Sequence, residues 1–139
     1  MRVNVRLAPT YDAANAEKTL REIILQDVPY GAQVEINNVR AASGWNASEY
    51  EPYFDEAVKS ASNLFFGKNM CSFGMGGAIP LMGMLQKIWP GRPYLITGVL
   101  GPLSNAHGPN EFLHLEYAKK LTCCLAYVVA RSGEHFSKK

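Results

Sequence analysis

One stretch decides the fold expected for this chain of 139 residues, and it reads TGVLGPLSNAHGPNEFL from Thr97 to Leu113. Its first residues complete a nearly continuous apolar run over 94–100, which is typical of a strand covered on both faces. A loop with two glycines and two prolines follows over 101–110. A helix is then predicted from about Leu113 to Arg131. A strand, a rigid loop and a helix in succession indicate an α/β protein.

The same alternation extends toward the N-terminus. Strands are predicted over 3–7, 33–37, 70–73 and 94–100, and helices over 13–26, 48–66, 79–88 and 113–131. Asp12 is the expected N-cap of the first helix, and Ile23 and Ile24 are assigned to its inner face. Ser48 to Glu51 has the form of a capping box, and Gly67 is the expected C-cap of the second helix. The predicted fold class is therefore α/β, with α+β layering as its variant.

The composition excludes several classes of function. Apolar residues make up 47% of the chain and charged residues 19%, which is the balance of a soluble globular protein. The formal net charge is only +2 and the basic residues are scattered, so neither nucleic acid nor a membrane surface is expected as a partner. Cys71, Cys123 and Cys124 lack C-x-x-C spacing, so reduced thiols in a cytoplasmic protein are expected. No apolar run reaches membrane-spanning length, and no signal region opens the sequence.

His107 is the leading candidate for chemistry. Functional groups in α/β folds favour the loops that follow strands, and imidazole suits zinc at neutral pH. Taken alone, a loop histidine is more often a surface or hydrogen-bonding residue, by roughly three to one. The glycines of residues 74–77 resemble a phosphate cradle only weakly, because the Walker lysine is absent. The pair Glu111 and His114 is typical of surface chemistry, and His135 is assigned no role.

Several motifs add a family resemblance. The run Asn105 to Leu113 resembles the histidine loop near the C-terminus of the carnosinase-like, di-zinc exopeptidases, a group of dipeptidases, aminoacylases and carboxypeptidases. Val5 to Thr10 and Pro29 to Ala32 resemble the second half of the family's lid, or dimerisation, domain. Gly76 to Pro80 resembles its Gly-Gly-(small)-Ile-Pro motif. The similarity covers nearly the whole chain, and the histidine loop is its specific part.

The resemblance implies two parts and a partner. Residues 1–47 are expected to form the C-terminal half of a ferredoxin-like lid domain, and residues 48–139 the C-terminal segment of an α/β zinc-peptidase catalytic domain. A homodimer formed through the lid is implied for the parent enzyme.

The resemblance also implies site residues. His107 is expected to bind one of two zinc ions, and Gly76, Gly77 and Asn105 are expected beside a small peptide-like substrate. Asn110 and Glu111 precede the last helix and are expected to cap it, because its dipole favours an acidic group there.

The implied chemistry is that of a zinc metallopeptidase in which metal-activated water hydrolyses a peptide or related amide bond. The family's other ligands and its general base belong to His-x-Asp and Glu-Glu motifs upstream of the lid, and neither motif occurs in this sequence. Zinc needs three or four protein ligands, so the chain alone is expected to be inactive without a missing N-terminal half. Gly74 stands where many members have a carboxylate-binding arginine, which leaves the substrate open.

Two other hypotheses stay open. One is a non-catalytic α/β module that dimerises through residues 1–47. The other is a degenerate relative that has lost its metal site.

Overall fold

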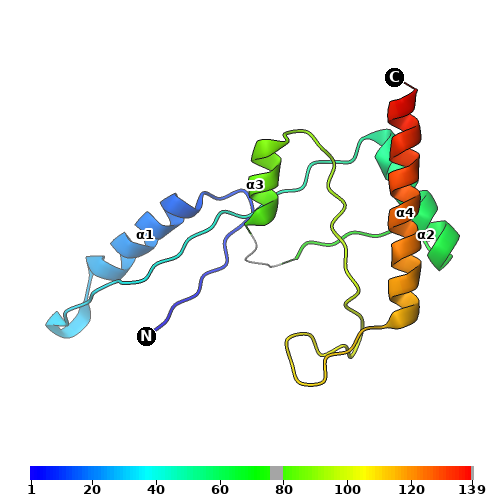
Figure 1. Ribbon diagram of the computed structural model, residues 1–139. Coiled ribbons are helices and arrows are strands. Elements are labelled where there is room, and N and C mark those ends of the chain that lie inside the picture. Colours follow the sequence, from blue (N-terminus) through cyan, green and yellow to red (C-terminus); the bar gives the residue numbers. More distant parts are fainter. Residues whose placement is uncertain (76–79, 139) are drawn as a thin grey trace. The chain divides into compact units, whose positions relative to one another are not determined.

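The computed structural model describes residues 1–75 and 80–138 of the chain. The helices of these residues, labelled in Figure 1 where there is room, are α1 (Ala13–Gln26), η1 (Pro29–Gly31), α2 (Pro52–Phe66), α3 (Leu81–Ile88) and α4 (Leu115–Ser137). The chain divides into two compact units: Met1–Ala47 with Gly74–Arg92, and Ser48–Phe73 with Pro93–Lys139. Whether residues 1–47 and 48–139 belong to different domains of a longer protein stays a prediction.

The predicted α/β layering is wrong, because the part of the chain that the structure describes contains no β-strand. The expected ferredoxin-like half is therefore absent from residues 1–47, and the apolar run over 94–100 is irregular. A strand is stable only where its backbone groups pair with a neighbouring strand and its apolar face is covered. Neither condition is met here, and Val3 and Val5 are 56% and 48% exposed.

The start of α1 follows its local sequence signals. The predicted bounds of the helix and its N-cap are confirmed, because a side-chain oxygen of Asp12 accepts the N–H of Asn15 at 2.8 Å. That bond satisfies one of the N–H groups that a helix leaves unpaired at its start. Ala13 is buried, and its N–H donates to Ser43 Oγ at 3.1 Å. The first turn is thus fixed by a cap and by one bond to a distant segment.

The second half of α1 has an uncovered apolar face. Ile23 and Ile24, predicted to face inward, are exposed instead. The guanidinium of Arg21 donates to the Glu17 carboxylate at 2.9 Å and to the carbonyl of Ile36 at 3.2 Å. Polar contacts therefore join this part of α1 to the following segment, where a sheet had been expected.

α3 belongs to the same unit and is joined to it by a tryptophan. The half-buried Trp45 donates its indole N–H to the side-chain oxygen of Gln86 in α3. Next to it, the chain passes close to Pro9, since a Cβ atom placed on Gly44 would lie 2.5 Å from Pro9 Cα. Gly44 thus allows a close backbone approach that any side chain would prevent.

In the second unit α2 and α4 pack side by side (Figure 1). Their apolar residues recur at helical spacing, so each helix presents a stripe to the other. The buried members of this core are Phe54, Ala57, Val58, Ala61, Cys124 and Val128. The contact is close, because Cys124 Sγ lies 3.4 Å from the carbonyl oxygen of Ala61 and donates to it. Mutual burial of the two stripes stabilises helices that would be marginal alone.

Of the two predicted ends of α2, the start is wrong and the end is confirmed. The capping box expected over 48–51 does not form, and Glu51 is the N-cap without a side-chain bond. The reason is Pro52, which lacks an N–H and is tolerated only in the first turn, so the helix begins there. At the other end Gly67 has a left-handed φ of 67°, which confirms the predicted C-cap.

α4 starts two residues later than predicted and continues six residues past Arg131, to Ser137. The extra turns are anchored to α2, since the His135 ring stacks on Tyr53 with centroids 3.9 Å apart and planes 7° apart. Phe136 also meets Tyr53, edge to face at 5.7 Å. Although α4 is 23 residues long, neither it nor another helix of the described residues is apolar enough to cross a membrane.

Candidate functional site

The loop that carries the predicted histidine is closed at its base by Ser104. The N–H of Phe112 donates to the Ser104 carbonyl at 3.2 Å and so joins the two ends of the loop. Ser104 N–H donates to the carbonyl of Gly101 at 3.2 Å, and Ser104 Oγ accepts the N–H of Gly101 at 3.0 Å. Only 2% of Ser104 is exposed. A buried hydroxyl whose partner is in place holds the base of the loop together.

Within this loop a tighter turn surrounds His107. The N–H of Gly108 donates to the carbonyl of Asn105 at 2.9 Å, and the side-chain amide of Asn105 donates to the carbonyl of Pro109 at 2.6 Å. The backbone N–H of His107 donates to Glu111 Oε2 at 3.2 Å. Asn105 and His107 have left-handed φ angles of 54° and 62°, a region that asparagine and histidine enter more readily than most residues.

His107 is exposed at this turn, so its imidazole is accessible to a ligand. Across residues 1–75 and 80–138, no group of three or more His, Cys, Asp or Glu side chains gathers in a way that could hold a metal ion. An exposed imidazole on a hydrogen-bonded turn has the donor chemistry of one zinc ligand, while a firm site needs three or four. His107 is therefore not part of a complete metal site within these residues, and its role as a metal ligand stays a prediction.

The capping expected of Asn110 and Glu111 is not seen. α4 begins at Leu115 with His114 as its N-cap, and no side chain caps it. The two residues precede the helix, as expected, but neither caps it. The Glu111 carboxylate accepts the backbone N–H of His107 instead, which makes it part of the histidine turn.

The other residues singled out in the sequence are only partly covered by the structure. Gly76 and Gly77 lie outside the described residues. Gly74 is exposed, and a Cβ atom built there would meet nothing within 4 Å. His135, to which no role was assigned, is instead a packing residue against Tyr53.

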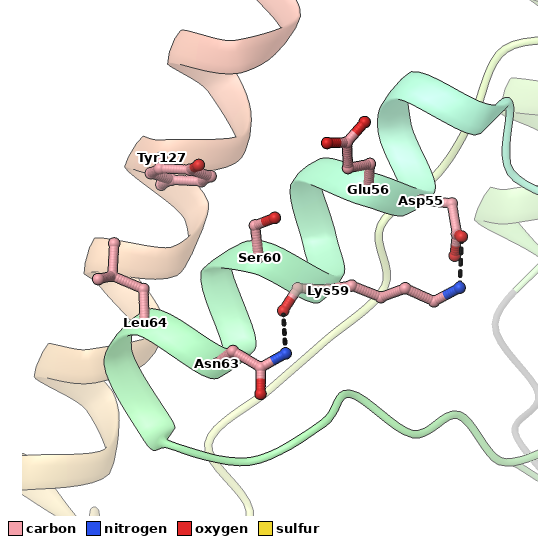
Figure 2. A pocket seen from close by; sticks show the side chains of 7 residues that line it. All are labelled: Asp55, Glu56, Lys59, Ser60, Asn63, Leu64 and Tyr127. Carbon is pink, nitrogen blue, oxygen red and sulfur yellow. Dashed lines mark hydrogen bonds and ion pairs between the residues drawn. The ribbon is translucent and has the colours of Figure 1, made fainter.

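One surface feature was missed by sequence reasoning, namely an open hollow beside α2 and α4 (Figure 2). Its lining residues are Asp55, Glu56, Lys59, Ser60, Asn63, Leu64 and Tyr127. Lys59 Nζ pairs with Asp55 Oδ2 at 2.5 Å, and Asn63 Nδ2 donates to the Lys59 carbonyl at 3.1 Å. The i, i+4 spacing of these residues could have indicated from the sequence that they share one face of α2. Because the cation is paired locally with its acidic neighbour, we assign no ligand to the hollow.

Two groups of the second unit have shifted pKa values. Burial raises the pKa of the Tyr50 phenol, and the carboxylate of Asp55 raises it further. The Tyr50 hydroxyl donates to the carbonyl of Tyr94 at 3.3 Å. Burial also raises the pKa of the Cys124 thiol, with a smaller contribution from Cys123. Both shifts favour the neutral form, so neither group is prepared as a base or nucleophile at neutral pH.

Comparison with known proteins adds one relative. No family model matches the chain. The chain is similar to the cysteinylglycine-S-conjugate dipeptidase of Corynebacterium striatum, with 29% identity over 108 residues that make up 78% of this chain and 24% of the relative. The chain therefore spans about a quarter of the length of the curated relative it matches. The similarity supports a dipeptidase family and, at the level of that family, a peptidase-type function.

Proposed function

We propose that this chain is part of a metal-dependent peptidase, to which it contributes His107 as one metal ligand. The similarity to a dipeptidase is the observation that carries the peptidase class. The loop supports the role of His107, because an exposed imidazole sits on a turn whose backbone is held by hydrogen bonds. Zinc is the expected metal, since imidazole is among its preferred ligands, and when bound it supplies Lewis-acid chemistry.

The proposal assigns the rest of the machinery to residues outside this chain. A single histidine cannot hold zinc firmly, because protein zinc sites use three or four ligands. The other ligands and the general base are expected in an N-terminal segment of a longer protein, and this chain alone is expected to be inactive. Asn105 is expected near the substrate, as are Gly76 and Gly77.

The proposed substrate is a small peptide or a related amide. The C. striatum relative is named for a dipeptidase activity on cysteinylglycine S-conjugates, and dipeptides of that kind are reasonable first substrates. Gly74 offers no charge to a substrate carboxylate, and the space around it is open. An arginine fork cannot be replaced by glycine, so a free carboxylate must be bound elsewhere or not at all.

The first test reads the source gene upstream of the codon for Met1. A long in-frame extension with His-x-Asp and Glu-Glu motifs is the expected result. An extension without these motifs would contradict the metal-dependent peptidase, because the ligands that His107 needs would then be absent.

The second test uses the longer protein that such an extension encodes. Chelation is expected to abolish dipeptide hydrolysis, and added zinc is expected to restore it. His107→Ala is expected to lower zinc content and to reduce kcat/KM by more than about 100-fold, since even outer-shell partners of zinc ligands are worth about 10- to 100-fold. His114→Ala is the matched control, because His114 is also exposed but lies at the N-cap of α4. Full zinc content in His107→Ala would reject the ligand role.

A second proposal is that the chain forms a homodimer through residues 1–47. The observation that favours it is the number of exposed apolar side chains in this part, among them Val3, Val5, Ile23 and Val34. Apolar surface of this kind is often covered by a partner. Sedimentation equilibrium of the chain is expected to show a dimer that dissociates on Val3→Glu, and a monomer at all concentrations would exclude it.

A further inference from the structure

We propose that Asn105 is the positioning residue of the histidine loop, whose side-chain amide locks the turn that presents His107. The inference rests on the metal role proposed for His107 and deepens it. Asn105 is expected near the substrate, and its side-chain amide is engaged within the loop. Its role is therefore exerted on the backbone around His107.

Two hydrogen bonds from one residue close the same turn. The Asn105 carbonyl accepts the N–H of Gly108 at 2.9 Å, and the Asn105 amide reaches one residue further to the carbonyl of Pro109 at 2.6 Å. His107 lies inside the segment that these bonds span. The Asn105 side chain thus adds a second hydrogen bond across a turn that is otherwise closed by one backbone hydrogen bond.

Gly108 is shaped to fit the Asn105 side chain. A Cβ atom on Gly108 would lie 2.7 Å from Asn105 Nδ2 and 2.8 Å from both Cγ and Oδ1. Gly108 is not among the described residues with positive φ, so its own backbone does not demand a glycine. A side chain on residue 108 would therefore force the Asn105 amide out of the position from which it donates to Pro109.

Glu111 fastens the turn from its other side. Its Oε2 accepts the backbone N–H of His107 at 3.2 Å, and His107 itself has a left-handed φ of 62°. With the Asn105 lock on one side and this bond on the other, few backbone rotations remain for His107. A ligand held in this way loses less conformational freedom when it binds, which is the benefit of preorganisation.

Asn105→Gly tests the lock most directly, because glycine keeps the left-handed backbone accessible and removes only the amide. In the full chain, the Gly108 amide proton is expected to exchange at least about 10-fold faster, as local opening becomes easier. The three-bond HN–Hα coupling of His107 is expected to move toward an averaged value. Asn38→Gly is the matched control, since Asn38 is exposed and left-handed, with a φ of 57°. It should leave both signals unchanged.

The Gly108→Ala variant tests the fit between the two residues. Alone, it is expected to disturb the His107 coupling as much as Asn105→Gly does. In the double variant Asn105→Gly/Gly108→Ala the obstructing side chain is gone, so the second change should add almost nothing. Fully additive effects would overturn the proposed lock. The amide signals of α2 and α4 show in every variant whether the second unit is folded.

A zinc titration, followed through the imidazole signals of the three histidines, separates this inference from the proposed function. We expect His107 to respond to zinc in the unsubstituted chain, and Asn105→Gly to loosen its turn. In a longer protein with the remaining ligands, that variant should bind zinc about 10- to 100-fold more weakly. A zinc response at His107 with an unchanged turn in Asn105→Gly would overturn the positioning role alone. In the longer protein, a loosened turn in Asn105→Gly together with full zinc content in His107→Ala would overturn the metal role and leave only the lock of the turn.

Discussion

Phe54→Ala is expected to lower the free energy of unfolding of the α2–α4 unit by about 3–5 kcal/mol. Phe54 is only 8% exposed, and its ring meets those of Tyr50 and Tyr53 edge to face at 5.0 Å and 6.1 Å. Burial of a phenylalanine side chain is worth about 1.5–3 kcal/mol, and each aromatic pair adds about 0.5–1.5 kcal/mol. These contributions together span about 2.5–6 kcal/mol, which includes the range typical of such truncations.

The assay is urea unfolding followed by far-UV circular dichroism, to which α2 and α4 contribute most of the helical signal. Phe73→Ala is the matched control, because Phe73 belongs to the same unit but is 80% exposed. It is expected to change the free energy of unfolding by no more than about 0.5 kcal/mol. Equal decreases in the free energy of unfolding in the two variants would refute the view that Phe54 belongs to the core of this unit.

Three further predictions concern single groups. Cys124 is expected to react with a thiol reagent far more slowly than the exposed Cys123 in the native chain, because Cys124 is buried and its pKa is raised; equal native rates would argue against that burial. The raised pKa of Tyr50 means that the unfolded chain loses the phenol proton first as pH rises past about 10, so stability should fall with alkaline pH, and Tyr50→Phe should flatten this dependence of the urea midpoint. An unchanged pH dependence would remove Tyr50 as its source. Gly67→Ala should lower the free energy of unfolding by about 1 kcal/mol, because the φ of Gly67 is 67°. Gly133→Ala should raise it by up to about 1 kcal/mol, because Gly133 lies inside α4 with open space around it. The midpoint of thermal unfolding should therefore fall in the first variant and rise in the second.

The helices were predictable because their determinants are local. Asp12 and Gly67 act on backbone groups within a few residues, so the sequence around them contained the information needed to place them. The errors at other helix ends have two different physical causes, one local and one not. Pro52 moved the start of α2, and the stacking of His135 on Tyr53 extended α4 through a contact that no local pattern contains.

The strands were not predictable in this way, because pairing depends on a second segment. The alternation of Val3 and Val5 shows that this segment could present one apolar face, but says nothing about what would pair with it. No pairing occurs in the described residues, and both side chains are exposed. A short apolar alternation is therefore evidence for a strand only where a neighbour is known.

At the candidate site too, the sequence indicated which residue was of interest but not the contacts that hold it in place. His107 was singled out by its place in a Gly/Pro loop together with a family resemblance, and its metal role stays a prediction. The hydrogen bonds that hold the loop could not be predicted from the sequence. They depend on the burial of Ser104 and on the bond from the Asn105 amide to the Pro109 carbonyl. Glu111 was assigned to a helix end from its charge, yet its nearest backbone partner proved to be the histidine itself.

The bond between Trp45 and Gln86 has a practical consequence for spectroscopy. The chain has two tryptophans, Trp45 and Trp89, and both belong to the unit of Met1–Ala47 and Gly74–Arg92. Indole emission therefore reports on that unit alone, and loss of the Trp45 contact with α3 should shift it to longer wavelength. The ellipticity of α2 and α4 reports mainly on the other unit. One unlabelled sample thus contains two separate optical probes, and recording both along a single denaturant series would reveal whether the two units melt together or one after the other.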